Sequence, residues 1–202
     1  MILCIFAVAL FAQTAHQHHP PQSADEYAKV LNDPARDGWQ KPHEVVMGLN
    51  LKSTDVVADI GAGTGYFARR FAMHAAKVYA VDIDTSLLKI AANGAPKNME
   101  TVLSAPDDPK LPDASVDLIF ICDVLHHIDN RPAYFAKLAK ALKPGGRIVN
   151  IDFFKKQLPI GPPVEMKLSE EQVIAELAAA GFKKKAAYTF LTYQYFLEFE
   201  RR

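Results

Sequence analysis

Apolar and polar positions along the chain form alternating blocks that predict strands and helices in turn. Apolar, strand-like runs occupy residues 56–60, 77–83, 100–103, 115–123 and 147–152. Apolar residues at helical spacing predict helices beginning at Pro42, containing Phe67 to Ala72, and covering 86–92, 131–142 and 169–180. The run 115–123 is almost wholly apolar, which is typical of a central parallel strand covered on both faces. This alternation predicts one α/β domain with a doubly wound, mostly parallel sheet.

The C-terminal third of the chain changes pattern. The helix 131–142 is predicted to stop at the turn formed by Lys143 to Gly146, and the helix 169–180 to start with a capping box at Ser169 to Gln172. Two terminal runs rich in Tyr and Phe, about 184–190 and 193–200, predict strands that add an antiparallel edge. The expected total is therefore seven strands.

Three glycines at every second position follow the first predicted strand. Gly61, Gly63 and Gly65 stand before an amphipathic segment, so backbone N–H groups can approach a ligand closely there. A dinucleotide site would read G-x-G-x-x-G, with the pyrophosphate on the helix N-terminus. This run reads G-x-G-x-G and is preceded by Asp59, a carboxylate that suits a ligand with an ammonium group better than a diphosphate.

The stretch D-I-G-A-G-T-G resembles the first motif of class I S-adenosylmethionine-dependent methyltransferases. The resemblance covers roughly residues 39–202, including the L-K-P-G-G turn and the aromatic antiparallel end. It implies a Rossmann-like fold and S-adenosyl-L-methionine as the cofactor. The first motif would bind the cofactor through Asp59, Gly61, Ala62, Gly63 and Gly65.

Acidic residues after the second and third strands extend the expected cofactor site. Asp82, 23 residues after Asp59, stands where a carboxylate accepts hydrogen bonds from ribose hydroxyls, with Ile83 beside it; the alternative is a solvated turn aspartate. In the family that the chain resembles, an acidic residue after the third strand often holds the adenine amino group. Either Asp107 or Asp108 is expected there, although Ser104 to Pro106 intervene where the family has an Asp-Ala pair.

The end of the fourth strand supplies the candidate catalytic groups. The segment Cys122 to Ile128 is similar to the family's fourth motif, which closes over cofactor and substrate. His127, His126 and Asp123 are candidates for a base if the acceptor must lose a proton, and Asp123 is also a cofactor-binding candidate. Each histidine has a structural alternative, a hydrogen bond to a backbone carbonyl.

Segments on either side of the core are expected to complete the site. Trp39 and Gln40 would wall the methionine end of the cofactor, or Trp39 would serve as a hydrophobic anchor. Residues 153–163, a loop with Pro and Phe after the fifth strand, are long enough to form a lid with substrate contacts.

Composition narrows the partners. The 202 residues are 50% hydrophobic and 23% charged, and the formal net charge is zero. Proteins that bind nucleic acid normally carry larger clusters of basic residues, so a small-molecule substrate is favoured over RNA or DNA. Two cysteines, Cys4 and Cys122, exclude the thiolate-rich subclass that acts on arsenite. No metal site is expected.

The N-terminus suggests a location. Residues 2–12 form an uninterrupted apolar run, long enough for a signal-peptide core and too short to span a bilayer; a buried helix or an uncleaved anchor is the alternative. We therefore predict a signal peptide over 1–15 and export, a linker with a helical extension over 16–38, and the methyltransferase domain over 39–202. No stable membrane span is expected.

Three functions remain open from the sequence. The first is a small-molecule methyltransferase, indicated by Asp59, the glycine run and Asp82. The second is an NAD-dependent oxidoreductase, which the G-x-G-x-G spacing disfavours. The third is a non-catalytic protein that keeps the fold and the ligand as a binding or scaffold protein.

Overall fold

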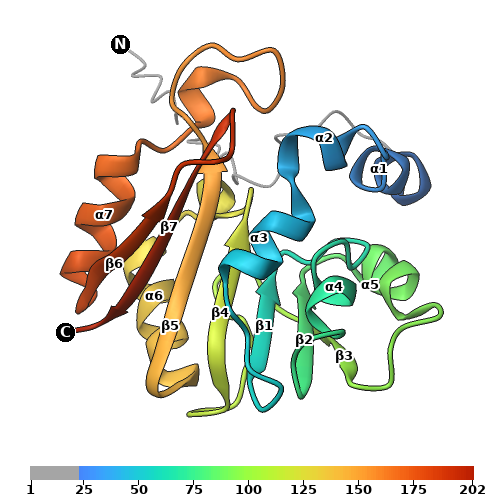
Figure 1. Ribbon diagram of the computed structural model, residues 1–202, viewed down its shortest axis with the longest axis horizontal. Helices are drawn as coiled ribbons and strands as arrows, with labels where there is room; N and C mark the ends of the chain where they lie inside the picture. The colour runs from blue at the N-terminus through green and yellow to red at the C-terminus, as the bar shows by residue number, and fades with distance from the viewer. Residues whose placement is uncertain (1–22) are drawn as a thin grey trace, which may run out of the picture.

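A computed structural model describes residues 23–202, so the predicted signal peptide and the first part of the linker lie outside the described residues. Seven strands form one sheet in the order β3-β2-β1-β4-β5-β7-β6 (Figure 1). Their bounds are β1 Val56–Ile60, β2 Lys77–Asp82, β3 Met99–Leu103, β4 Val116–Cys122, β5 Leu142–Phe153, β6 Phe182–Tyr188 and β7 Gln194–Arg201. The expected sheet of seven strands, mostly parallel with an antiparallel C-terminal strand, is confirmed: β7 runs antiparallel to both β5 and β6.

Helices flank the sheet on both faces. The α-helices are α1 Ala24–Leu31, α2 Arg36–Gln40, α3 Pro42–Gly48, α4 Ala68–Phe71, α5 Thr85–Ala92, α6 Arg131–Ala141 and α7 Glu170–Ala179, and the 3-10 helices are η1 Leu125–His127 and η2 Val164–Met166. One core joins α6 and α7 to the sheet, and a second core joins α3 and α4 to its other face. Among the described residues, no helix is long and apolar enough to cross a membrane.

The central strand β4 shows why its sequence is apolar at nearly every position. Leu118 and Phe120 belong to the core beneath α3 and α4, whereas Ile119 and Ile121 belong to the core beneath α6 and α7. Successive side chains of a strand point to opposite faces, so a strand covered on both faces needs apolar residues of both parities. This confirms the interpretation of the run 115–123.

Two elements differ from their expected form. The helix after the glycine run is a single turn, Ala68–Phe71, because tight turns close its C-terminal end through Met73 N to Arg70 O and His74 N to Phe71 O. The L-K-P-G-G segment does not separate helix from strand. It belongs to β5, which pairs with β4 at Leu142 and again at Arg147, so the four residues between them bulge out.

Parallel pairing sets the place of the site. β2, β1 and β4 are neighbours and run in the same direction, so their carboxyl ends meet at one edge of the sheet. Ligands of doubly wound sheets bind in the crevice beyond this edge. In Figure 1 the helices α1 and α2 lie beyond the end to which the arrowheads of β1 and β4 point.

Candidate cofactor and active site

A cavity of about 550 Å³ lies at the carboxyl edge of the sheet. This volume falls within the roughly 300–1,000 Å³ of small-molecule sites. The lining comes from α1 and α2, the glycine loop, the residues that follow β2, β3 and β4, and the loop after β5. The predicted site residues that line it are Trp39, Asp59, Gly61, Ala62, Gly63, Asp82, Ile83, Asp123 and His127. Gly65, Asp107, Asp108 and His126 do not belong to this lining.

The glycine loop is held against the end of β2. Gly61 N and Ala62 N both donate to Val81 O, at 2.7 and 3.0 Å. Gly61 has a φ of +71°, and a Cβ there would lie 2.1 Å from Val124 Cγ2, so both backbone conformation and space require glycine. Gly65 contributes to the turn rather than to the cavity, since its N–H donates to Ala62 O.

Asp59 is the most unusual group in the cavity. Its side chain is buried, and Oδ2 has no hydrogen-bond partner among residues 23–202. Burial raises the pKa of this carboxyl to about 8, against the lowering effects of a backbone hydrogen bond from Ala68 and the charge of Arg36. A buried carboxyl without a partner is costly unless a ligand satisfies it. An ammonium group satisfies both its charge and its hydrogen-bonding capacity.

Asp82 is buried and already bonded to the backbone. Its Oδ2 accepts a hydrogen bond from Gly63 N at 2.7 Å, and its Oδ1 accepts one from Asp84 N at 2.9 Å. These bonds fix the carboxylate at the cavity wall, while each oxygen keeps a second acceptor site for a ligand hydroxyl. Ile83 is 54% exposed and lines the cavity, so it offers an apolar surface to a flat ring.

The structure does not bring the two adenine candidates into the cavity. Asp107 and Asp108 point to the lysines around them: Lys137 pairs with both, at 3.7 and 3.5 Å, and Lys110 pairs with Asp108 at 3.1 Å. The cause is the turn closed by the bridge between Ala105 and Asp108, which follows from the extra residues after β3. Residues 104–106 line the cavity in place of the two aspartates.

The two adjacent histidines have different surroundings. His126 Nδ1 lies 2.9 Å from Asp152 Oδ2, and the two side chains are 3% and 0% exposed. Burial lowers the pKa of His126, but the hydrogen bond and charge of Asp152 outweigh it, so the pKa is raised. His126, a catalytic candidate from the sequence, therefore has a partner on β5, and this partner is a carboxylate rather than the backbone carbonyl of the structural alternative. His127 lines the cavity and packs its ring 4.2 Å from that of His126.

Asp123 lines the cavity at the end of β4 in a left-handed conformation, with a φ of +60°. Its Oδ1 accepts a hydrogen bond from Gln194 Nε2 at 2.6 Å, and its Oδ2 lies 3.6 Å from the Cys122 thiol. Burial, followed by the charge of Asp152, raises the pKa of Asp123 to about 7. A carboxyl with such a pKa exchanges protons near neutrality, as a general base requires.

The segment before the core forms a cover over the cavity. Trp39 lines the cavity and packs against Phe153, with ring centroids 5.7 Å apart, so it is both a wall and a packing residue. Gln40 is fully buried and bonds to Gln194, so it does not wall the cavity as expected. Gly161 and Phe153 are the parts of the expected lid loop that reach the lining.

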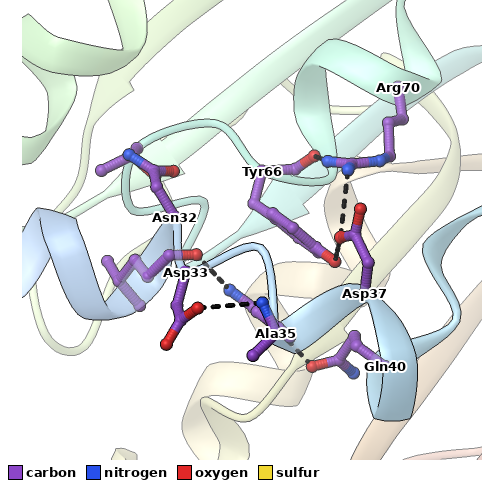
Figure 2. Close-up of polar contacts among 10 residues, drawn as sticks. Asn32, Asp33, Ala35, Asp37, Gln40, Tyr66 and Arg70 are labelled. Carbon is purple, nitrogen blue, oxygen red and sulfur yellow. Dashed lines mark hydrogen bonds and ion pairs between the residues drawn. The ribbon is translucent and has the colours of Figure 1, made fainter.

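Polar contacts hold this cover to the glycine loop and to the residues that follow it (Figure 2). The Tyr66 hydroxyl donates to Asp37 Oδ1 at 2.5 Å, and Arg70 pairs with the same oxygen at 3.3 Å. The Arg36 guanidinium stacks 4.0 Å above the Tyr66 ring. Thr64 donates to Asn32 Oδ1 at 2.7 Å. We refer to these six residues as the clasp.

Several lining residues were not predicted from the sequence. Tyr27, Val30 and Arg36 reach the cavity from the N-terminal extension, and Tyr134 reaches it from α6. The capping box in which Ser23 and Glu26 bond reciprocally marks the start of α1, and this S-A-D-E pattern is a signal that the sequence contained.

The charge of the cavity selects among ligands. Among the described residues, its lining holds four carboxyl groups (Asp59, Asp82, Asp84 and Asp123), one guanidinium and no lysine. A diphosphate would meet these carboxylates unfavourably, whereas a ligand with an ammonium group and ribose hydroxyls fits Asp59 and Asp82. Within the same part of the chain, no group of three or more His, Cys, Asp or Glu side chains could hold a metal ion.

Comparisons with known proteins agree with this geometry. A family model described as "Methyltransferase domain" matches residues 58–150. The demethylmenaquinone methyltransferase of Tropheryma whipplei (strain Twist) is 33% identical over 146 residues, 71% of this chain and 60% of the relative. Phosphoethanolamine N-methyltransferase 1 of Arabidopsis thaliana is 32% identical over 123 residues, 57% of this chain and 24% of the relative. The chain thus spans less than two thirds of these relatives' lengths.

A solved structure covers more of the fold. The crystal structure of a SAM-dependent methyltransferase from Aquifex aeolicus superimposes with a TM-score of 0.81 and 26% identity, covering 89% of this chain and 98% of that one. The structure titled "DhpI-SAH complex structure" superimposes with a TM-score of 0.72 at 20% identity, covering 88% and 91%, and shows the shared fold.

Proposed function

We propose that this chain, which belongs to the class I S-adenosylmethionine-dependent methyltransferases, transfers the methyl group of that cofactor to a small-molecule acceptor. The observation that carries the proposal is the buried Asp59 carboxyl, whose Oδ2 has no partner among the described residues and which precedes a glycine loop shaped for close approach. The amino-acid end of the cofactor supplies the ammonium group that this carboxyl lacks.

Different residues of the cavity would bind different parts of the cofactor. Asp59 would bind its ammonium group, Asp82 its ribose hydroxyls, and the exposed face of Ile83 would pack against adenine. When bound, the cofactor supplies an electrophilic methyl group on a sulfonium. The protein then has to orient a nucleophile, exclude water and accept any proton that is released, so positioning supplies most of the catalysis.

The acceptor is proposed to be small and without a phosphate or carboxylate. Four carboxyl groups and one guanidinium line the cavity, and this guanidinium is engaged with Gln40, the Leu31 carbonyl and the Tyr66 ring. An anionic acceptor would therefore lack a counter-charge. Trp39 and Phe153 offer an aromatic wall in its place.

Calorimetry with S-adenosylhomocysteine and with NAD tests the proposed cofactor. We expect the first to bind and the second not to bind; the reverse result would identify an oxidoreductase. Methyl transfer from labelled cofactor into an extract of the source cells then separates an enzyme from a non-catalytic binding or scaffold protein. Binding without any labelled product would favour the scaffold.

Export is a separate proposal that rests on the apolar run of residues 2–12 alone. Fusion of residues 1–22 to a reporter that is active only after export provides the test. Activity of the fusion would support a signal. A silent reporter would leave the buried-helix alternative.

A further inference from the structure

A chain of three buried or half-buried side chains leads from α2 to the acceptor end of the cavity. Arg36 Nε donates to Gln40 Oε1 at 3.2 Å. Gln40 Nε2 donates to Gln194 Oε1 at 2.7 Å, and Gln194 Nε2 donates to Asp123 Oδ1 at 2.6 Å. Gln40 and Gln194 are 0% and 1% exposed, so water does not compete for the bond between them.

The direction of every bond in this chain follows from Arg36. A guanidinium has donors and no acceptor, so the oxygen of the Gln40 amide must face it and the nitrogen must face Gln194. The second proton of that nitrogen is directed at Cys122 Sγ, 3.4 Å away. Gln194 must then present its oxygen to Gln40 and its nitrogen to Asp123.

This direction makes the two carboxyl oxygens of Asp123 unequal. Oδ1 receives a proton from an amide that cannot turn round without losing its bond to Gln40. Oδ2 faces the Cys122 thiol at 3.6 Å, which is a weak donor. A proton taken up by the carboxyl therefore has its place on Oδ2, at a residue that lines the cavity.

We propose that Arg36, Gln40 and Gln194 are positioning residues that direct Asp123 Oδ2 to accept the proton released by the methyl acceptor. The proposal rests on the proposed function and narrows its acceptor to a nucleophile that bears a transferable proton. In the step, the acceptor atom forms a bond to the methyl carbon, and the carbon–sulfur bond breaks with its electron pair going to sulfur. The acceptor's proton goes to Asp123 Oδ2 and then to solvent.

Charged and titratable groups from several elements surround Asp123. Asp152 on β5 and His126 on η1 act on it with opposite charge effects, and Arg36 on α2 opposes Asp152. The thiol of Cys122 and the hydroxyls of Tyr27 and Tyr195 complete this set. Burial together with these groups places the pKa of Asp123 at about 7, which suits proton uptake near neutrality.

Carbon-13 NMR titration of the aspartate carboxyls tests the proposal without any methyl acceptor, and Asp123→Asn assigns the signal. We expect the wild-type Asp123 to titrate near pH 7. Gln194→Met removes the bond to Oδ1 and should raise this midpoint by about one to two pH units, the effect of one hydrogen bond to a charged group. Gln172→Met is the matched control on α7, where Gln172 bonds to Glu176, and should leave the midpoint unchanged.

Gln40→Glu tests the direction of the chain. A carboxylate at position 40 accepts and does not donate, so the Gln194 amide should turn its nitrogen to position 40 and its oxygen to Asp123. The midpoint should then rise further than in Gln40→Met, which imposes no direction and adds no charge; the new negative charge at position 40, which lies beside Arg36, adds to this rise. These two variants give the same comparison if Gln194→Met fails to fold.

A midpoint near pH 4 in the wild type, the ordinary value for an aspartate, would overturn the proposal. A midpoint unchanged in both Gln194→Met and Gln40→Glu would also overturn it, because a purely structural role lowers thermal stability without moving the titration. Calorimetry with S-adenosylhomocysteine on the same samples keeps the two questions apart. Failure of that ligand to bind refutes the proposed function, whereas an unshifted titration in a protein that binds it refutes only the positioning role.

Discussion

Replacing Asp59 with asparagine should weaken S-adenosylhomocysteine binding in a way that depends on pH. The substitution keeps the size of a side chain that is 3% exposed and removes the negative charge that the ligand's ammonium group would meet. A hydrogen bond to a charged group contributes about 1.5–3 kcal/mol. At about 1.4 kcal/mol for each factor of ten, the dissociation constant at pH 8 should rise roughly 10- to 150-fold.

The pH dependence follows from the carboxyl's pKa of about 8 in the ligand-free protein. Below this value Asp59 is protonated and must lose its proton to bind an ammonium group. The wild-type dissociation constant should therefore fall about tenfold per unit as pH rises from 6 to 7, and level off near pH 8. The difference from Asp59→Asn should then be largest at pH 8 and nearly vanish at pH 6.

Stability measurements separate lost binding from lost folding. The folded-state pKa of Asp59 lies above its unfolded value of 3.8, so the folded protein holds the proton more tightly and loses stability as pH rises from about 4 to about 8. Asp59→Asn removes this loss and should unfold at a higher urea concentration than wild type at pH 8, with no such gain at pH 4.

Isothermal titration calorimetry at pH 6, 7 and 8 measures the affinities. Asp55→Asn, which lies just before the same strand at its opposite end and bonds to Lys52 N, is the matched control and should bind normally. A dissociation constant for Asp59→Asn within twofold of wild type at pH 8, or a wild-type affinity that does not change between pH 6 and 8, would refute the role assigned to this carboxyl.

Three further predictions test the supports of the site. Gly61→Ala should destabilise the fold by about 1–3 kcal/mol in urea unfolding, because the new Cβ would clash with Val124. The control, Gly94→Ala, has a similar φ of +62° but no atom near the new Cβ, so it should destabilise the fold less; equal losses would show that the contact with Val124 is unimportant. Tyr66→Phe removes the bond to Asp37 and should speed S-adenosylhomocysteine release about 2- to 10-fold in stopped-flow measurements, whereas an unchanged rate would argue against the clasp. Asp152→Asn should cost more stability at pH 6 than at pH 9. Asp152 raises the pKa of His126 in the folded protein above its value in the unfolded chain, so protonated His126 stabilises the fold at low pH, and this stabilisation is lost as pH rises through the folded-state pKa. Equal losses at both pH values would contradict the pairing.

Local patterns were sufficient for the core of this fold. The apolar run of β4, the apolar spacing of the helix 86–92 and the capping residue Ser169 predicted elements that the structure contains, because each depends on neighbours within a few positions. The glycine spacing with Asp59 and Asp82 likewise predicted the side of the cavity formed by β1 and β2.

Features that depend on partners distant in sequence could not be predicted from these local patterns. His126 and His127 are adjacent in sequence, and only the packing of β5 beside β4 shows that the first faces Asp152 and the second the cavity. The sequence could not show that Asp107 and Asp108 both lie outside the cavity lining. One of their lysine partners, Lys137, lies on α6, and the other, Lys110, follows the same turn. Gln194 gave no signal, since its two partners lie 154 and 71 positions away.

Three carboxyl groups lie at neighbouring strand ends. They differ in how many hydrogen-bond donors the protein already supplies to their oxygens, and this difference gives them different roles. Asp82 has backbone donors on both oxygens and can only add weak acceptor contacts, which suits hydroxyl groups. Asp123 has one strong donor and one weak one, which leaves an oxygen for a proton. Asp59 has an oxygen without a partner among the described residues, and a cation satisfies it best. Environments that separate otherwise identical groups in this way assign distinct roles in one site. Exchanging the roles would require moving these donors, which are Gly63 N and Asp84 N for Asp82 and the Gln194 amide for Asp123, and no substitution of the aspartates alone does that.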